Sequence, residues 1–520
     1  MTTKKRRVRF APSPTGPLHM GGVRTALYNY LYAKQAGGDF ILRIEDTDSN
    51  RFVPGAEEYI IEALRWCGIL PDEGVDAEGH VVEKPSEQHP HAPYRQSQRR
   101  HIYRKYAEEL VSKGFAYYAF DSAEELAALR AAAEAEKRTF TYNHETRLTL
   151  KNSLTLAPEE VVRRLVETND WTIRFKIDPN RLVEMDDLIR GHITVNACTL
   201  DDKVLWKKAD ELPTYHLANI VDDHLMEVTD VIRGEEWLPS LPLHYLLYEA
   251  FGWQDSRPNF AHLSLLLKPD GKGKLSKRDG DKMGFPVFPL KWVAPDGEVS
   301  RGYREDGYYP EAFINLLAML GWNPGTEQEL FTLPELVEAF SLERVVKSGA
   351  RFNFEKAKWF NQEYLRRRSQ ADLIAEFRRL NAEHLEGFND EYIGAVLDLM
   401  KERAHFAHEL WDLTAFFFEP PKTYDEASVA KFWKEEVPDI LPEVSRFLKG
   451  LKPFDKEHID TLLHDLITFR NWSMGKVMNT LRLFLVGESK GPGVSDIMQI
   501  IGRDETGFRI DRGIRVLNEK

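Results

Sequence analysis

Hydrophobic positions near the start of the chain follow first a strand-like and then a helix-like spacing. Residues 8–11 are a short strand candidate, and from 23 to 34 the apolar residues mostly recur three or four positions apart, which is the spacing of one helix face. Residues 40–44 are mostly apolar and predict a second, buried strand. A strand, a helix and a strand in so short a stretch predict a βαβ unit with parallel strands and a right-handed crossover. Further helices are predicted over about 54–67 and 98–113.

This alternation of strands and helices is lost from about 120 to 212 and then returns. An Ala/Glu-rich helix is followed by period-two alternation over 171–177 and by strand-like runs over 192–197 and 203–208. These runs predict an inserted α+β module. The α/β pattern resumes over 214–253.

The remainder of the chain has a different pattern. Residues 284–307 are rich in Pro and Gly and predict a loop or a small insertion, to which the sequence assigns no role. After about residue 350 strand signals nearly vanish, and amphipathic helices continue to the end. We therefore predict a Rossmann-like α/β domain that is split by an α+β insertion and followed by an all-α C-terminal region.

Composition and charge narrow the class of protein. The chain is 42% hydrophobic and 29% charged, as is typical of soluble globular proteins. Its net charge of -13 argues against indiscriminate adhesion to nucleic acid or membrane, although a local basic face stays possible. The two cysteines, Cys67 and Cys198, exclude a disulfide framework and a Cys-rich zinc site, and they predict a reducing compartment. We expect neither a secretory signal nor a membrane span.

The stretch RFAPSPTGPLHMGG, residues 9–22, joins the first predicted strand to the first helix. Prolines hold such a loop open in advance, and glycines let a ligand approach the backbone. Free N–H groups at the start of the helix predict a site for an anion such as phosphate, and His19 could contact a phosphate or ribose oxygen. There is no G-x-G-x-x-G and no Walker lysine. A plain strand-to-helix turn with a capping histidine therefore stays open.

The stretch KGKLSKRDG, residues 272–280, gathers four cations around Ser276 and between glycines. A mobile cationic loop suits the neutralisation of charge on a transferring phosphate. A solvated surface loop is the alternative.

The stretch RIEDTDSNR, residues 43–51, follows the second predicted strand. Its acidic spacing resembles the start of a calcium loop, but Arg51 stands where glycine is needed and Pro54 breaks the loop, so we exclude calcium. Glu45 at the carboxyl end of a parallel strand would face the ligand crevice and could receive an α-ammonium group. Helix capping and ion pairing are the alternative.

The stretch TYHLANIVDDHLMEVTDVIRGEEW, residues 214–237, places Tyr215 and Asn219 before a predicted strand and Arg233 near its end. Arginine can bind a carboxylate through two parallel hydrogen bonds, and Trp237 could stack on a base. A satisfied strand edge with surface ions is the alternative.

Together these motifs resemble class I aminoacyl-tRNA synthetases. Within that class, RFAPSPTGPLHMGGVRTALYNYLYA, GGDFILRIEDTD, PGAEEYIIEALRWCGI, PYRQSQR and residues 214–237 are similar to the glutamyl-tRNA synthetase family. The resemblance is dense over about 6–120 and 170–345 and looser beyond. The helical region resembles the bacterial anticodon-binding module. The resemblance implies the following parts: catalytic domain, first half, 1–120; inserted acceptor-end domain, 121–212; catalytic domain, second half, 213–265; stem-contact region with the KLSKR loop, 266–350; helical anticodon-binding domain, 351–430 and 431–520.

The resemblance implies an ATP-dependent ligase that joins L-glutamate to the 3′ end of tRNA(Glu) through a glutamyl-adenylate, releasing AMP and diphosphate. It implies ATP with Mg²⁺, L-glutamate and tRNA(Glu) as partners, and a monomer in the cytoplasm. Some relatives carry a Cys-based zinc cluster in the insertion, but Cys198 stands alone there. We therefore expect no zinc or other protein-bound metal.

The resemblance also implies a role for individual residues. The catalytic residues would be His19, Lys274, Ser276 and Lys277. The ATP site would comprise His19, Gly21, Gly22, Glu236, Trp237 and Lys277. The glutamate site would comprise Arg9, Ser13, Glu45, Tyr215, Asn219 and Arg233. A buried guanidinium favours glutamate over glutamine, because the neutral amide leaves its charge unpaired.

An RNA partner has to be reconciled with the negative net charge. Basic clusters at 366–368 and 378–379 and Arg470 could follow RNA phosphates, or could be ordinary solvated helix faces. Trp359 and Trp472 could stack on unpaired bases, but we interpret them as core residues.

Other functions stay open at this stage. A relaxed synthetase would also charge tRNA(Gln). An enzyme that glutamylates a modified tRNA base would lack the helical region, and a nucleotidyltransferase of the same superfamily would be much shorter. A non-catalytic RNA-binding paralogue would be expected to lose His19, the lysine loop or the pocket arginines, and all of these are present.

Overall fold

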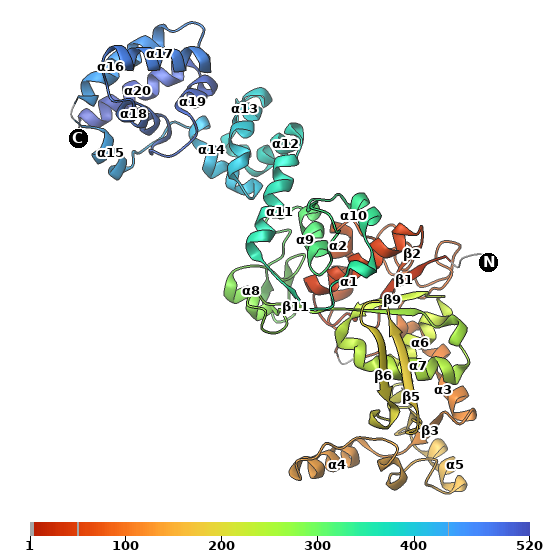
Figure 1. Cartoon of the computed structure of the whole chain (residues 1–520). Helices are drawn as coiled ribbons and strands as arrows, with labels where there is room; N and C mark the ends of the chain where they lie inside the picture. The colour runs from red at the N-terminus through yellow and green to blue at the C-terminus, as the bar shows by residue number, and fades with distance from the viewer. Residues whose placement is uncertain (1–4, 49–50, 435, 520) are drawn as a thin grey trace. The chain divides into compact units, whose positions relative to one another are not determined.

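The structure is a computed structural model that describes residues 5–48, 51–434 and 436–519. The chain divides into two compact units, 1–357 and 358–520 (Figure 1). No helix in the described part of the chain is both long and apolar enough to cross a membrane.

A six-stranded sheet in the order β2-β1-β9-β10-β5-β6 forms the centre of the first unit. Its strands are β1 (Arg7–Phe10), β2 (Asp39–Leu42), β5 (Leu182–Asp187), β6 (Gly191–Asn196), β9 (Asp230–Gly234) and β10 (Asn259–Leu263). β5 and β6 pair antiparallel, and the other neighbours pair parallel. The carboxyl ends of the parallel strands therefore meet at one edge, where ligands bind in open α/β sheets.

The helices around this sheet are α1 (Met20–Gln35), α2 (Ala56–Trp66), α3 (Arg100–Ser112), α6 (Tyr215–Leu225) and α7 (Leu241–Phe251). The apolar positions of α1 that give the helical spacing, including Val23, Leu27 and Leu31, are fully buried. α1 contacts β1, β2 and β9 through this face. The predicted βαβ unit with parallel strands is confirmed.

A smaller antiparallel sheet in the order β3-β4-β7-β8 lies apart from the central one. Its strands are β3 (Ala116–Ala119), β4 (Thr172–Phe175), β7 (Val204–Lys207) and β8 (Leu212–Pro213), and it is accompanied by α4 (Ala123–Ala135) and α5 (Pro158–Glu167). Figure 1 shows α4 and α5 at the far end of the first unit from α1. The predicted insertion also contributes β5 and β6, which extend the central sheet. Alternate residues of β5 are buried, so one of its faces packs inward.

The segment that follows the lysine loop contains a short hairpin of β12 (Trp292–Val293) and β13 (Val299–Ser300). Tyr59 of α2 holds its base, because the Tyr59 hydroxyl donates to the Leu290 carbonyl at 2.6 Å and the two rings of Tyr59 and Trp292 meet edge to face. The loop or small insertion predicted over 284–307 is thus an anchored hairpin. The first unit is completed by β11 (Leu266–Leu267), α8 (Lys277–Met283), α9 (Pro310–Met319), α10 (Leu333–Ala339) and β14 (Ala350–Arg351).

The second unit is built from helices, as predicted, and α11 (Phe354–Arg367) leads into it. The others are α12 (Gln370–Leu380), α13 (Asp390–Met400), α14 (Leu410–Phe418), α15 (Glu426–Phe432), α16 (Val437–Gly450), α17 (Lys456–Phe469), α18 (Met474–Val486), α19 (Val494–Ile501) and α20 (Arg503–Asn518). Leu481, Phe484 and Ile510 lie in its core. Trp359 and Trp472, which we predicted as core residues, are only partly buried.

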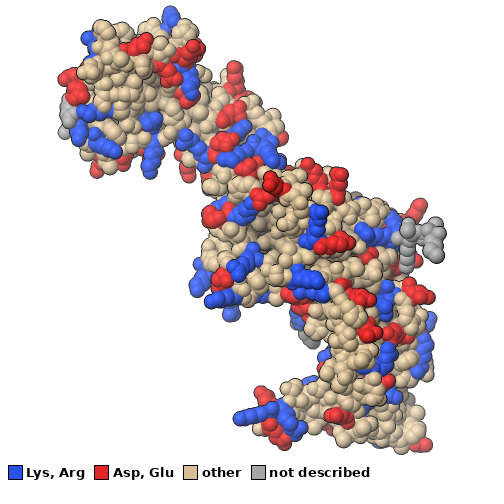
Figure 2. Space-filling model, in the orientation of Figure 1, with Lys and Arg blue, Asp and Glu red and all other residues tan. Residues whose placement is uncertain are grey.

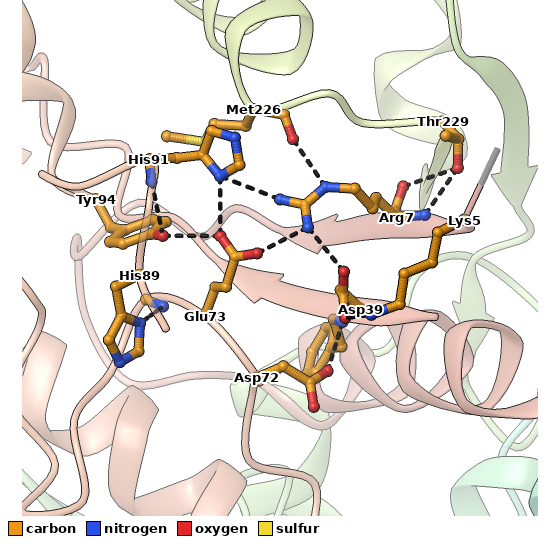
Figure 3. Close-up of polar contacts among 12 residues, drawn as sticks. Lys5, Arg7, Asp39, Asp72, Glu73, His89, His91, Tyr94, Met226 and Thr229 are labelled. Atoms are coloured by element: carbon orange, nitrogen blue, oxygen red, sulfur yellow. Dashed lines mark hydrogen bonds and ion pairs between the residues drawn. The ribbon is translucent and has the colours of Figure 1, made fainter. Parts of the chain in front are cut away.

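A buried ion-pair network stabilises the amino ends of the first two strands (Figure 3). Arg7 begins β1 and pairs with Asp39, which begins β2, at 2.8 Å, and with Glu73 at 2.7 Å. Glu73 also accepts from Tyr94 at 2.8 Å and lies 3.0 Å from the Nδ1 atom of His91. Burial alone would raise the pKa of Glu73, but the hydrogen bonds from His91, Arg7 and Tyr94 outweigh it and lower the pKa to about 2. This network lies at the edge of the sheet opposite to the carboxyl ends.

Glu73→Gln is therefore expected to destabilise the first unit by about 2 kcal/mol at pH 7. The folded-state pKa lies below the unfolded value of about 4.5. The ionised carboxylate thus stabilises the fold above that pH, and its contribution is lost as the pH falls toward 2. Urea unfolding at pH 7 and pH 3.5, with the exposed Glu58→Gln as control, should show a difference that shrinks on acidification. A difference that grows on acidification would contradict the assignment.

Candidate active site

Two neighbouring cavities open at the carboxyl edge of the central sheet, and Ser13 lines both. The larger, of about 630 Å³, lies between the His19 turn and the loop at 274–277. The smaller, of about 410 Å³, is lined by Glu45, Tyr215 and Trp237. Side chains from distant parts of the sequence therefore meet where the fold class predicts a ligand.

The His19 side chain offers an unused hydrogen-bond donor to the larger cavity. The backbone N–H of Gly21 donates to His19 Nδ1 at 3.1 Å, so the ring of a neutral histidine carries its proton on Nε2. Nε2 is buried and has no hydrogen-bond partner among the described residues. Burial and the positive charge of Lys274 lower the pKa of His19 to about 4, which keeps it neutral at physiological pH.

The backbone amides at the start of α1 are already occupied. Met20 N–H donates to the Val287 carbonyl at 2.8 Å, Gly21 N–H donates to the His19 ring, and Gly22 N–H donates to the His19 carbonyl at 2.8 Å. These three N–H groups are therefore not free, contrary to the expectation from the sequence. Two of them donate to His19, as the alternative of a capping histidine implies, and the third donates to Val287, whose approach the local sequence does not reveal. Gly22 has a packing role instead, because a Cβ there would lie 2.5 Å from Leu18.

The lysine loop forms the opposite wall of the larger cavity, with Lys274, Ser276 and Lys277 among its lining residues. Ser276 is the N-cap residue of α8, and Asp279 Oδ2 accepts hydrogen bonds from its hydroxyl at 2.5 Å and from its backbone N–H at 3.0 Å. Lys277 Nζ lies 2.7 Å from Glu298 Oε1 at the tip of the hairpin. The tip of the hairpin thus contacts the wall formed by the lysine loop. Its base, which contains Val287 and Phe288, contacts the wall formed by the His19 turn, where the Phe288 ring packs edge-on against His19.

A chain of buried charges lies beneath the smaller cavity. Asp223 accepts from Arg9 Nε at 3.1 Å and from Arg43 Nη1 at 2.7 Å, and Arg43 Nη2 donates to Glu45 Oε1 at 3.0 Å. Asn219 also donates to Glu45, at 3.3 Å, and its own Oδ1 is buried without a partner among the described residues. Burial would raise the pKa of Asp223, but Arg9 and Arg43 outweigh it and hold the pKa below its usual range. Burial raises the pKa of Glu45, which Arg43 and Arg9 offset only in part.

Arg233 is buried on β9, behind Tyr215 of the smaller cavity, and does not itself line either cavity. It forms no ion pair with a carboxylate in the described part of the chain. Its Nη1 donates to the Tyr215 hydroxyl at 2.7 Å, and its Nε donates to His262 Nε2 at 3.0 Å. Burial lowers the pKa of Arg233, and Tyr215 offsets this in part. The buried guanidinium therefore lacks the negative partner that such a group normally has.

The two pKa shifts at this cavity indicate what it can bind. Glu45 and Arg233 are each shifted toward the neutral form, because each buried charge is incompletely compensated. A ligand with an ammonium group near Glu45 and a carboxylate near Arg233 would compensate both. Every α-amino acid carries these two charges, and one with an acidic side chain carries a second carboxylate as well.

The structure places the other predicted residues in two groups. Gly21, Gly22 and Glu236 line the larger cavity with His19 and the lysine loop. Trp237, which the family pattern assigned to ATP, lines the smaller cavity and packs on Tyr215 with the ring centres 4.4 Å apart.

Sequence reasoning missed three buried charged or polar residues that contact the predicted ones or each other, Arg43, Asp223 and His262. It also missed Asp187, which contacts His262. The sequence did contain a signal for such residues, namely a charged residue inside an apolar strand or on the apolar face of a helix. Among the described residues, no three His, Cys, Asp or Glu side chains gather so that they could hold a metal ion.

The basic clusters of the helical unit are largely paired with acids. Arg366 pairs with Glu363 at 2.6 Å and Arg378 with Asp390 at 2.6 Å, and Arg470 pairs with Glu443. Figure 2 shows positive and negative side chains interspersed on this face of the molecule. These clusters therefore do not by themselves mark an RNA-binding face.

Comparison with known proteins covers almost the whole chain. Residues 5–359 match the family model of tRNA synthetases class I (E and Q), catalytic domain, and residues 370–514 match an anticodon binding domain. A glutamate–tRNA ligase of Porphyromonas gingivalis is 55% identical over 518 residues, which cover 99% of this chain and 100% of the relative. One of Flavobacterium johnsoniae is 54% identical over 517 residues, with the same coverage. The crystal structure of a glutamate tRNA ligase from Elizabethkingia meningosepticum, in complex with its amino acid, superposes with a TM-score of 0.93 at 53% identity, covering 99% of this chain and 100% of that one.

Proposed function

The chain belongs to the glutamate–tRNA ligase family of class I tRNA synthetases, and we propose that it joins L-glutamate to the 3′ end of tRNA(Glu), converting ATP to AMP and diphosphate. The observation that carries the proposal is the smaller cavity, which is lined by Glu45 and Tyr215, with the buried guanidinium of Arg233 hydrogen-bonded to Tyr215 behind it. Glutamate supplies an ammonium group for Glu45 and a side-chain carboxylate for Arg233.

The reaction requires two transfers. An oxygen of the glutamate α-carboxylate attacks the α-phosphorus of ATP, the bond between the α- and β-phosphates breaks, and glutamyl-adenylate and diphosphate form. A hydroxyl of the terminal adenosine of the tRNA then attacks the carbonyl carbon and loses its proton, and AMP departs. Neither transfer needs a covalent bond to the protein, so positioning and charge stabilisation are its main contributions.

The glutamate site follows from the buried charges. Glu45 and the unpartnered Oδ1 of Asn219 would accept hydrogen bonds from the α-ammonium group. Arg233 would bind the side-chain carboxylate, oriented by its hydrogen bond to Tyr215, and Arg9 would add positive charge for the carboxylates. Ser13 lines both cavities and so stands where the α-carboxylate would meet the α-phosphate.

The ATP site would occupy the larger cavity. His19 would donate from Nε2 to a phosphate or ribose oxygen, and Gly21 and Gly22 line the same cavity. Lys274 and Lys277 would stabilise the charge on the reacting and departing phosphates, with Ser276 shaping their loop. A contact of Trp237 with ATP remains a prediction from the family pattern.

Mg²⁺ would enter with ATP, because it is bound largely by phosphate oxygens and water and needs only one or two protein carboxylates. Glu236 is a carboxylate that lines the ATP cavity and could serve as one.

We further propose that the enzyme acts as a monomer, since both cavities are formed by residues of one chain. Its free thiols, Cys67 and Cys198, suit the reducing cytoplasm.

Exchange of radiolabelled diphosphate into ATP, in the presence of tRNA(Glu), tests the first transfer. We expect exchange that depends on glutamate and is not supported by glutamine or aspartate. Exchange that is independent of glutamate, or equal with glutamine, would overturn the proposed substrate.

The ion pair between Lys277 and Glu298 gives a separate prediction. Glu298 holds the lysine that would contact the ATP phosphates, so the two compete for one charge. Glu298→Gln is expected to lower the KM for ATP by about two- to fivefold, because exposed ion pairs are worth at most about 1 kcal/mol. Steady-state exchange kinetics measure this, with the KM for glutamate as an internal reference.

Asp296→Asn is the matched control for this prediction. Asp296 lies in the same hairpin turn and accepts from the Glu298 backbone N–H at 3.0 Å, but it forms no ion pair with Lys277 in the described structure. It should leave the KM for ATP unchanged. A higher KM in Glu298→Gln would mean that Glu298 positions Lys277 rather than competes for it.

A further inference from the structure

We infer that His262, held in place by Asp187, is a positioning residue that orients Arg233 and leaves its charge free to select an anionic side chain. The inference deepens the proposed function, and it rests on the assignment of Arg233 to the side-chain carboxylate of glutamate.

The three residues form a row across adjacent strands at the carboxyl edge of the sheet. Arg233 on β9 and His262 on β10 are register partners, and Asp187 ends β5 on the other side of β10. Arg233 Nε lies 3.0 Å from His262 Nε2, and His262 Nδ1 lies 2.6 Å from Asp187 Oδ2. The side chains of His262 and Asp187 are fully buried.

The direction of the first hydrogen bond fixes the state of the histidine. Arginine Nε can only donate, so His262 Nε2 must accept, and the ring proton must therefore lie on Nδ1, facing Asp187. A doubly protonated ring would place one N–H against another. Burial lowers the pKa of His262, and Asp187 offsets this only in part, which agrees with a neutral ring.

Asp187 is itself fixed by the backbone. Its Oδ1 accepts from the N–H groups of Ile189 at 2.9 Å and Arg190 at 2.7 Å, in the turn that leads to β6. Because both of its oxygens are engaged, the aspartate holds one ring orientation and one tautomer, as a carboxylate does for a metal-bound or catalytic histidine. The row therefore sets the plane of the Arg233 guanidinium.

A neutral acceptor at this position matters for specificity. A carboxylate in contact with Arg233 would neutralise the guanidinium and compete with the substrate. His262 satisfies Nε without adding negative charge, and the negative charge of Asp187 is separated from Arg233 by the ring. The guanidinium also contacts Tyr215 at 2.7 Å, the Trp237 carbonyl at 3.4 Å and His244 at 3.5 Å. These groups are uncharged at physiological pH, since burial raises the pKa of Tyr215 and lowers that of His244.

Three variants of His262 separate orientation from packing. His262→Leu removes the acceptor, His262→Gln keeps an acceptor near the position of Nε2, and His262→Glu places a carboxylate against Arg233. His89→Leu is the matched control, because His89 is also buried and accepts a backbone hydrogen bond at 3.3 Å, but at the opposite edge of the sheet. Thermal melting and the KM for ATP report whether each variant folds and keeps the other cavity intact.

Glutamate-dependent exchange should show that the variants change the KM for glutamate but not the KM for ATP. We expect His262→Leu to raise the KM for glutamate by about 10- to 100-fold, the worth of one hydrogen bond to a charged group, while the KM for ATP stays within about threefold. His262→Gln should largely restore the KM for glutamate. His262→Glu should lose more of the preference for glutamate over glutamine than His262→Leu does.

The outcomes distinguish this inference from the proposed function. If the unaltered enzyme shows no glutamate-dependent exchange, the proposed function fails and the inference falls with it. If the unaltered enzyme uses glutamate but His262→Leu keeps its KM and its preference, the inference alone is overturned. Equal damage in His262→Leu and His262→Gln would also overturn it, because a packing role does not depend on an acceptor.

Discussion

Replacing Lys277 with alanine is expected to slow glutamyl-adenylate formation by about 100- to 1,000-fold, the cost of removing one preorganised group that stabilises charge in a transition state. Lys277 begins α8, lines the larger cavity, which we propose holds ATP, and has its ammonium group within reach of a displaceable carboxylate, Glu298. Single-turnover formation of the adenylate measures the effect, and affinity for tRNA(Glu) should change little.

Lys272→Ala is the control for this experiment. Lys272 belongs to the same basic loop but does not line the cavity, so its removal should leave adenylate formation nearly unchanged. An equal loss of adenylate formation and tRNA affinity in Lys277→Ala would contradict the account, because Lys277 would then be an RNA contact.

Arg233→Ala is expected to lower kcat/KM for glutamate by about 100- to 1,000-fold and to remove most of the preference for glutamate over glutamine. Removing one partner of a buried, hydrogen-bonded charge pair costs about 2–5 kcal/mol, and a neutral amide loses less because it never paired with that charge. Exchange kinetics with each amino acid measure the ratio. Arg233→Lys should recover part of it, since lysine keeps the charge but not the two parallel hydrogen bonds.

Arg257→Ala controls for the loss of a guanidinium in the same unit. Arg257 stacks on the Tyr245 ring, 4.0 Å from its centre. Unlike Arg233, whose guanidinium hydrogen-bonds to Tyr215 of the smaller cavity, its side chain forms no hydrogen bond with a cavity-lining residue in the described structure. Arg257→Ala should keep the preference for glutamate. If Arg233→Ala also keeps that preference, the central specificity argument is wrong.

Local periodicity predicted much of the fold. The runs at 8–11, 23–34 and 40–44 appear as β1, α1 and β2, because each has a spacing that one buried face explains. The placement of β5 and β6 in the central sheet could not be predicted this way. Strand pairing between distant segments depends on tertiary register, which periodicity does not contain.

The candidate site was predicted in part. Motif chemistry pointed to residues that the fold brings to two neighbouring cavities, including His19, Glu45 and Lys277. It could not show that the Met20 amide is occupied, because its acceptor, the Val287 carbonyl, arrives from far along the chain. The contact of His262 with Arg233 was invisible for the same reason, since it follows from the alignment of β9 with β10.

Aminoacylation of purified tRNA(Glu) with radiolabelled glutamate or glutamine tests the central claim most directly. That claim is that the unpaired charge of Arg233, opposite Glu45, selects glutamate for transfer to tRNA. The account predicts that glutamate is attached and glutamine is not, and a parallel reaction with tRNA(Gln) shows whether the enzyme is discriminating or relaxed toward its tRNA. Attachment of glutamine with an efficiency close to that of glutamate, or no attachment of glutamate to tRNA(Glu), would contradict it.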